Sequence, residues 1–188
     1  METIFTPVKH YDKRLFRYMN RFFGLKCAPD LLLTKVFPNA KEITESSGAF
    51  WAYMEHLKDD FPLDDEDIHI VCVGDGVTPR TATMFAFRTK FNCVSIDPAL
   101  RTNAYGVDRL HCISKRVEEV DLHYPKVIIV AVHSHAKMDA TLDHITGDKR
   151  AMIAIPCCVK YDDIEPDVMY NDVGIWSTKN TIKIWKSI

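Results

Sequence analysis

Residues 71–79 read VCVGDGVTP, an apolar run that passes into a glycine turn and then into the expected start of a helix. Gly74 and Gly76 suit such a turn, because glycine tolerates positive φ and lets a ligand approach the main chain closely. A helix that begins after the turn presents free N–H groups to a carboxylate or phosphate. The stretch therefore predicts a strand, a turn and a helix, with a ligand bound at the turn.

A second apolar strand is expected over residues 93 to 96, and it runs into Asp97 and Pro98. An acid at this point is placed to accept hydrogen bonds from ribose hydroxyls, and its spacing from Gly76 fits the ~20 residues typical of nucleotide-binding βαβ units. In a plainer interpretation, the glycines only shape a tight turn and Asp97 is a solvated loop acid. Both interpretations stay open at this point.

The rest of the chain predicts an α/β fold. Short apolar runs typical of buried parallel strands occur at residues 68–73, 93–96, 110–113, 127–132 and 151–155. Residues 79–90 look like the helix of a right-handed βαβ unit, with Thr78 as its cap and Pro79 at its first position. Residues 173–177 and 181–185 flank a short polar turn, which indicates a β-hairpin. We expect a single doubly wound, mainly parallel sheet with a C-terminal antiparallel hairpin, preceded by N-terminal helices.

The N-terminal region is basic. Residues 9–26 carry six cations against one acid, with apolar residues at helical spacings: Lys9, Lys13, Arg14, Arg17, Arg21 and Lys26 face only Asp12. This predicts a basic amphipathic helix that stops near Gly24 and Pro29. It is either a surface helix docked through its aromatic face or a lid that faces RNA or the substrate. A second helix is expected over residues 44–58, with polar residues 44–47 capping or preceding it. We therefore divide the chain into an N-terminal helical extension (1–43) and a main domain (44–188).

Composition limits the classes of protein that remain. The 188 residues are 47% hydrophobic and 27% charged, which is typical of one globular domain. The formal net charge of -2 gives no general affinity for polyanions, so a nucleic-acid contact has to come from a local patch. No apolar stretch is long enough to span a membrane, and we expect a cytoplasmic protein with no membrane partner. The six cysteines lie mostly in apolar runs, which predicts free thiols and no disulfide-linked partner.

Over roughly residues 44–188 the chain resembles the class I, Rossmann-like S-adenosylmethionine-dependent methyltransferases. The resemblance lies in the glycine-rich first loop, the acid Asp97 after the second strand and the C-terminal hairpin. It implies a Rossmann-like sheet and S-adenosylmethionine as cofactor. By this resemblance the cofactor-binding residues are Gly74, Asp75, Gly76 and Thr78 in the loop, Asp97 and Pro98 after the second strand, and Arg116 and Val117 near the adenine ring.

The sequence departs from the family at two places. Cys72 stands where the family has an acid two residues before the first glycine, and Thr78 replaces the third glycine. Asp75 is the acid available in the loop to face a cationic ligand. The missing third glycine counts against NAD or FAD, whose pyrophosphate needs close approach to the backbone.

Two further motifs follow the expected fourth and fifth strands. Residues 130–135 read VAVHSH and residues 155–158 read IPCC, which resembles a subgroup of these enzymes. We expect His133, Ser134 and His135 to line the transfer site, since histidine accepts protons near neutral pH. Alternatively, the histidines are hydrogen-bonded loop residues. Because Cys157 and Cys158 lie close to the histidines in the expected sheet order, a Cys/His zinc site is conceivable, but adjacent cysteines lack the usual two-residue spacing of zinc ligands. We therefore interpret the two cysteines as packing or pocket-wall residues and expect no metal.

The resemblance implies methyl transfer from S-adenosylmethionine to an unidentified acceptor, and the basic helix favours RNA as that acceptor. A catalytically inactive methyltransferase-like scaffold that binds RNA or a protein is the alternative from another class. A nucleotide-binding enzyme of another reaction type is a third. The sequence defines neither the acceptor nor the oligomeric state.

Overall fold

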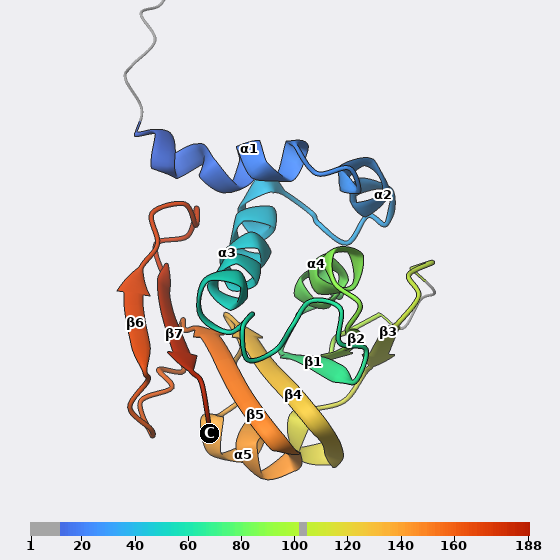
Figure 1. Cartoon of the computed structure of the whole chain (residues 1–188), viewed down its shortest axis with the longest axis vertical. Helices are drawn as coiled ribbons and strands as arrows, with labels where there is room; N and C mark the ends of the chain where they lie inside the picture. Colours follow the sequence, from blue (N-terminus) through green and yellow to red (C-terminus); the bar gives the residue numbers. More distant parts are fainter. Residues whose placement is uncertain (1–11, 102–104) are drawn as a thin grey trace, which may run out of the picture.

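The structure, a computed structural model, describes residues 12–101 and 105–188. Seven strands form one sheet in the order β3-β2-β1-β4-β5-β7-β6 (Figure 1). The strands are β1 (Ile68–Val73), β2 (Asn92–Ile96), β3 (Leu110–Ile113), β4 (Leu122–Val132), β5 (Ile145–Ile155), β6 (Val168–Asn171) and β7 (Thr181–Trp185). Strands β1 to β5 are parallel, whereas β7 pairs antiparallel with both β5 and β6. The predicted mainly parallel α/β fold with a C-terminal antiparallel strand pair is confirmed.

Helices cover both faces of this sheet. They are the 3₁₀ turns η1 (Lys13–Phe16) and η2 (Val117–Glu119) and the helices α1 (Arg17–Phe23), α2 (Ala28–Leu33), α3 (Ala40–His56), α4 (Arg80–Arg88) and α5 (Met138–His144). The helices α1 to α4 lie on one face and bury the larger apolar core, while α5 and η2 cover the other face (Figure 1). Among the described residues, no helix has both the length and the apolar character needed to cross a membrane.

The expected first arm of the hairpin is wrong: the strand runs from Val168 to Asn171, and residues 173–177 form part of the connection. The reason is Asp172, whose buried carboxylate contacts Arg17 and Tyr18 and accepts the Gly174 N–H. These contacts turn the chain away from the sheet. The apolar side chain of Ile175 then packs on helix α3 instead of continuing a strand.

Helix α3 begins earlier than predicted. Asn39 caps it by accepting the Glu42 N–H, so residues 44–47 are not the cap. Thr44, Glu45, Ser46 and Ser47 are instead buried within the helix, because this turn of α3 packs against the rest of the domain. The helix also runs across the division that we placed between residues 43 and 44.

The expected N-terminal helix is divided into η1 and α1, and it ends at Gly24 as predicted. Lys9 lies outside the described residues. The unpredicted short helix α2 follows, with Pro29 in its first turn, where a missing N–H costs nothing. Tyr18 and Phe22 of α1 are fully buried in the same core as α3 and α4. Within the described chain, the N-terminal helices therefore pack as part of the domain.

Candidate functional site

A cavity of about 550 Å³ lies at the carboxyl ends of the parallel strands. The strand order reverses between β1 and β4: the chain runs outward from β1 to β2 and β3, then crosses back to β4 and continues on the other side. Open α/β sheets bind ligands at the carboxyl ends of the strands at such a point. The volume suits a small organic ligand. The cavity is lined by Val73, Gly74, Gly76, Arg80, Ile96, Asp97, Pro98, Lys115, Arg116, Val117, Glu118, His133, His135 and Ala136.

The glycine turn after β1 forms one wall, and both glycines are required by geometry. Gly74 and Gly76 have φ values of 68° and 85°, which other residues rarely adopt. A Cβ added to Gly74 would lie 2.3 Å from the Ser134 Oγ. The turn is tied to β2, since the Gly74 N–H donates to the Ile96 carbonyl at 2.7 Å.

Asp75 does not line the cavity, and the expectation that its carboxylate faces the ligand is corrected by its placement. The side chain is only 3% exposed, because it accepts the N–H groups of Thr81 and Ala82 at 2.9 and 3.1 Å and the hydroxyl of Ser95 at 3.0 Å. Burial raises the pKa of Asp75, against the positive charge of Arg80 and these three donors. The N-cap residue of α4 is Pro79, so Asp75 satisfies two N–H groups of the first helical turn from the preceding loop.

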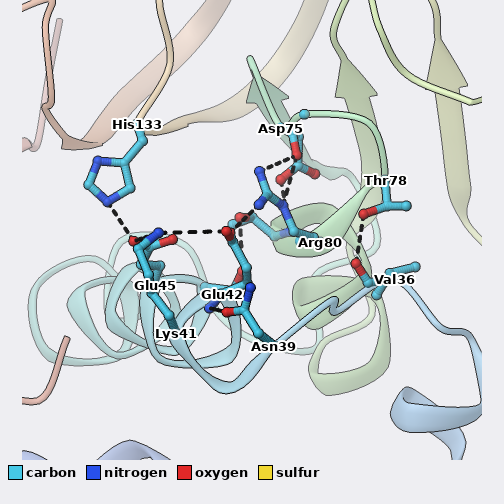
Figure 2. A network of polar contacts seen from close by, with 12 residues as sticks. Val36, Asn39, Lys41, Glu42, Glu45, Asp75, Thr78, Arg80 and His133 are labelled. Atoms are coloured by element: carbon cyan, nitrogen blue, oxygen red, sulfur yellow. Dashed lines mark hydrogen bonds and ion pairs between the residues drawn. The ribbon is translucent and has the colours of Figure 1, made fainter. Parts of the chain in front are cut away.

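Thr78 is not that cap. Its hydroxyl donates to the carbonyl of Val36, which ties the start of α4 to the segment before α3 (Figure 2). Thr78 is also absent from the cavity lining. The sequence alone favoured Thr78 because threonine is a common helix cap. In the structure the Asp75 carboxyl reaches across the turn and accepts the N–H groups of the first helical turn instead.

Asp97 lies at the cavity wall, as the sequence predicted. Its Oδ2 accepts the Gly76 N–H at 3.0 Å and its Oδ1 accepts the Ala99 N–H at 2.8 Å. Each carboxylate oxygen keeps a further lone pair for a ligand donor. Pro98, Arg116 and Val117 line the same cavity, so the structure brings these four predicted residues together.

Arg80 also lines the cavity and was missed. Its guanidinium donates to the Asp75 carbonyl, through Nε at 3.1 Å and Nη2 at 2.9 Å, and pairs with Glu42 of α3 (Figure 2). A sequence signal existed, because a cation in the first turn of a helix is disfavoured by the helix dipole. An arginine directly after Pro79 therefore calls for a nearby anion.

His133 follows β4 in a left-handed conformation with a φ of 51°. Its main-chain N–H donates to the Ile155 carbonyl at 2.9 Å, which holds the turn against β5. Its Nε2 lies 2.9 Å from Oε1 of Glu45, and the Lys41 Nζ lies 2.8 Å from the same oxygen (Figure 2). A non-glycine residue held at positive φ beside a cavity is a feature of functional sites.

Glu45 is a charged residue that sequence reasoning missed. It is only 2% exposed, and although burial raises its pKa, the contacts with His133 and Lys41 prevail and lower it to about 2. The carboxylate is therefore ionised at neutral pH and lies within ion-pair distance of the His133 ring. The pattern hid it, since Glu45 falls within the polar residues 44–47 that we interpreted as a helix start.

The two neighbours in the VAVHSH motif differ. Ser134 is 1% exposed, and its Oγ accepts the Ala136 N–H at 3.1 Å while it packs against Gly74, so it has a structural role. His135 is exposed and lines the cavity. Of the three expected catalytic residues, His133 and His135 reach the cavity and Ser134 does not.

A smaller cavity of about 220 Å³ adjoins the first and shares Arg80 and His133 with it. Its lining combines cations with two acids of α3 and consists of Lys41, Glu42, Glu45, Arg80, Val132, His133, Cys157, Ser177 and Lys179. His133 thus stands between two cavities, one at the glycine turn and one beside β5.

The basic residues of the N-terminal helices are largely engaged within the chain. Arg14 pairs with Asp12, Arg17 pairs with Asp172, and the Arg21 guanidinium lies 4.0 Å from the centre of the Trp51 ring. This arrangement agrees with the interpretation of a docked surface helix.

Neither a protein-family model nor a curated protein matches the chain. Among solved structures, a mutant of MtNAS in complex with S-adenosylmethionine is similar, with 14% identity and a TM-score of 0.51 over 93% of this chain and 78% of that chain. A second structure of the same mutant has 15% identity and a TM-score of 0.50 over 93% and 75%. Magnesium protoporphyrin IX methyltransferase from Synechocystis has 14% identity and a TM-score of 0.38 over 74% and 65%. At these identities the likeness to MtNAS shows the Rossmann-like fold alone.

Proposed function

We propose that the chain is an S-adenosylmethionine-dependent methyltransferase whose cofactor occupies the 550 Å³ cavity. The observation that carries the proposal is the pair of acids at the glycine turn. Asp97 offers carboxylate lone pairs at the cavity wall, while Asp75 fills the start of helix α4. The Asp75 carboxyl takes the N–H groups at the start of α4 that would otherwise bind a phosphate. The cavity therefore suits a nucleoside ligand without a phosphate better than a dinucleotide.

The residues present fit such a cofactor. Asp97 would accept the ribose hydroxyls. The apolar surfaces of Ile96, Pro98 and Val117 would hold the adenine ring, and Arg80 would face the amino-acid carboxylate. When bound, S-adenosylmethionine supplies an electrophilic methyl group on a cationic sulfur.

His133 is the proposed general base. If its Nε2 carries the proton and faces Glu45, its Nδ1 is left with a lone pair to take a proton from the acceptor. Glu45 would act as a positioning residue, since it holds the ring and the tautomer without touching the acceptor. The acceptor would enter through the smaller cavity, where Lys41 and Lys179 favour a group of negative charge.

The cofactor proposal is tested by the melting temperature of the folded chain with S-adenosylhomocysteine, since a ligand selective for the native state raises it. We expect a rise with this nucleoside and none with NADH at the same concentration. Asp97→Ala should weaken nucleoside binding by about 1 to 3 kcal/mol, because the ribose loses its charged acceptor. Asp59→Ala, which changes an acid of the loop before β1, is the matched control. No shift at millimolar nucleoside would contradict the proposal.

Catalysis is tested separately with His133→Asn. We expect this variant to bind S-adenosylhomocysteine as the parent does and to lose the transfer of labelled methyl groups by about 100-fold or more. If the parent chain binds the nucleoside yet transfers no methyl group to RNA, protein or small-molecule fractions, the result favours the alternative of a catalytically inactive scaffold.

A more specific proposal is that the methyl acceptor is RNA. It depends on the exposed cations Lys13 and Arg14. Phosphate contacts make the affinity for RNA fall steeply with salt. Anisotropy titrations of a short single-stranded RNA at two salt concentrations should show this slope for the parent and a flatter one for K13E/R14E. Weak binding that is insensitive to salt would point to a protein or small-molecule acceptor.

A further inference from the structure

Two cysteines and a histidine meet at the carboxyl ends of β4 and β5. These strands are neighbours in parallel register, with Val132 opposite Ile155, so the turns that follow them start side by side. His135 comes from the first turn, and Cys157 and Cys158 come from the second. The ligand atoms of the three side chains all lie within 4.8 Å of one another, and the Cys158 Sγ is 3.7 Å from the His135 Nε2.

We propose that Cys157, Cys158 and His135 bind a zinc ion. Zinc takes thiolate sulfur at about 2.3 Å and imidazole nitrogen at about 2.0 Å, so two such ligands of a tetrahedral site lie about 3.6 to 3.8 Å apart. The separation of the Cys158 Sγ from the His135 Nε2 already matches that span. The remaining separations exceed it by about 1 Å at most, which side-chain rotation in exposed turns can close.

The chemistry of the three ligands selects a soft or borderline metal. Thiolates and imidazole suit zinc, whereas calcium and magnesium need oxygen ligands, and the cluster contains no carboxylate. Three protein ligands leave the fourth tetrahedral position to water or a substrate, as in catalytic zinc sites.

A metal ion bound by these three side chains would be accessible from the cavities. The Cys157 thiol donates to the His133 carbonyl at 3.4 Å, which places this side chain beside the turn after β4. Metal binding would replace this contact, because the ligating thiolate has lost the proton that is donated. Cys157 also lines the smaller cavity, and His135 lines the larger one. The ion would lie where the two cavities approach each other. This inference does not depend on the proposed methyl transfer, because it needs only the three side chains.

The test uses the full reduced chain, with zinc measured by metal analysis after gel filtration and by competition with a chromogenic chelator. We expect one zinc per chain. With cobalt in place of zinc we expect a thiolate-to-metal charge-transfer band and the visible bands of tetrahedral coordination. Cys158→Ser and His135→Asn should each weaken zinc binding by about 100-fold or more, since even outer contacts of a metal ligand are worth 10- to 100-fold.

Cys112→Ser is the matched control, because Cys112 is a partly exposed thiol on β3, away from the cluster. It should retain the metal and the cobalt spectrum. Circular dichroism checks that every variant is folded. The proposal is overturned if the reduced parent binds no zinc, or if Cys112→Ser loses as much affinity as Cys158→Ser. It is also overturned if Cys157 and Cys158 form a disulfide in the purified protein and bind no zinc after reduction.

Discussion

The two halves of the sheet end differently around the same cavity. At the ends of β1 and β2, Asp75 and Asp97 accept main-chain N–H groups, so polar atoms are used to fix the turn. At the ends of β4 and β5, the polar side chains of His133, His135 and Cys158 are at least partly exposed. The first half holds its shape by hydrogen bonds to main-chain N–H groups, and the second presents the groups for which we propose proton transfer and metal binding.

This difference suggests that residues at the glycine turn serve mainly the stability of the fold, whereas residues at the ends of β4 and β5 serve mainly the chemistry of the site. Substitutions at the glycine turn should lower the free energy of unfolding, because they leave buried groups unpartnered or overlapping. Substitutions at the ends of β4 and β5 should change reactivity more than stability. The predictions below test that division, from the largest expected change in the free energy of unfolding to the smallest.

Gly74→Ala should have the largest effect, a loss of about 4 kcal/mol in the free energy of unfolding. The added Cβ meets the Ser134 Oγ at 2.3 Å, and the left-handed backbone is strained as well. Gly106→Ala is the matched control, since Gly106 has a φ of 65° but nothing within 4 Å of the added Cβ. It should lose about 1 kcal/mol. Equal losses in urea unfolding would show that Ser134 moves away freely.

Asp75→Ala should lower the free energy of unfolding by about 3 kcal/mol, because the N–H groups of Thr81 and Ala82 and the Ser95 hydroxyl lose their acceptor in a buried position. Asp75→Asn keeps one oxygen acceptor, so its loss should be smaller. Asp97→Ala should change stability by less than either, since Asp97 lies at the cavity wall. A loss for Asp97→Ala as large as for Asp75→Ala would remove the distinction between the two acids.

The parts of the fold that the sequence predicted well are those with a strong local signal. The apolar runs within β1, β2, β4 and β5 are buried in the sheet, and Gly74 and Gly76 mark the turn after β1. The first arm of the hairpin was misplaced because residues 173–176 are apolar whether they pair in a sheet or pack on helices. Only the contacts of Asp172 with α1 decide between these, and those contacts join distant parts of the chain.

The candidate site shows the same limit. Asp97, His133 and His135 follow strands directly, so their place at the sheet edge could be predicted. Glu45 reaches His133 because α3 packs beside the ends of the strands, and Arg80 at the start of α4 pairs with Glu42 of the same helix α3. Both partners lie far away in the sequence. The position of Arg80 in a first helical turn calls for an anion, but no local pattern identifies the residue that supplies it. A Cys/His zinc site was conceivable from the sequence but was disfavoured, because the usual ligand spacing within one segment says nothing of a third ligand supplied by a second segment.

Glu45→Gln should lower the free energy of unfolding at neutral pH by about 2 kcal/mol. In the folded chain the pKa of Glu45 is about 2, against an ordinary value of 4.5, so the folded state binds fewer protons than the unfolded state between these values. The stabilisation is therefore present above about pH 4.5 and disappears as the pH falls toward 2. The difference between parent and variant in urea unfolding should narrow from pH 6 to pH 3. Glu55→Gln, an exposed acid on the same helix, should show no such change.

His135→Asn should have the smallest effect on stability, less than about 0.5 kcal/mol in metal-free buffer, because the side chain is exposed and its strongest contact is at 3.7 Å. Urea unfolding in the presence of a chelator measures this value. With zinc added, the parent should gain stability by mass action and the variant should gain far less, since one of the three ligands is gone. The same substitution should thus leave the free energy of unfolding almost unchanged in metal-free buffer and lower it in the presence of zinc. This pattern distinguishes a residue that binds a metal from one that stabilises the fold directly. A large loss in metal-free buffer would mean that the ends of β4 and β5 are as structural as the glycine turn, and the contrast between the two halves of the sheet would not hold.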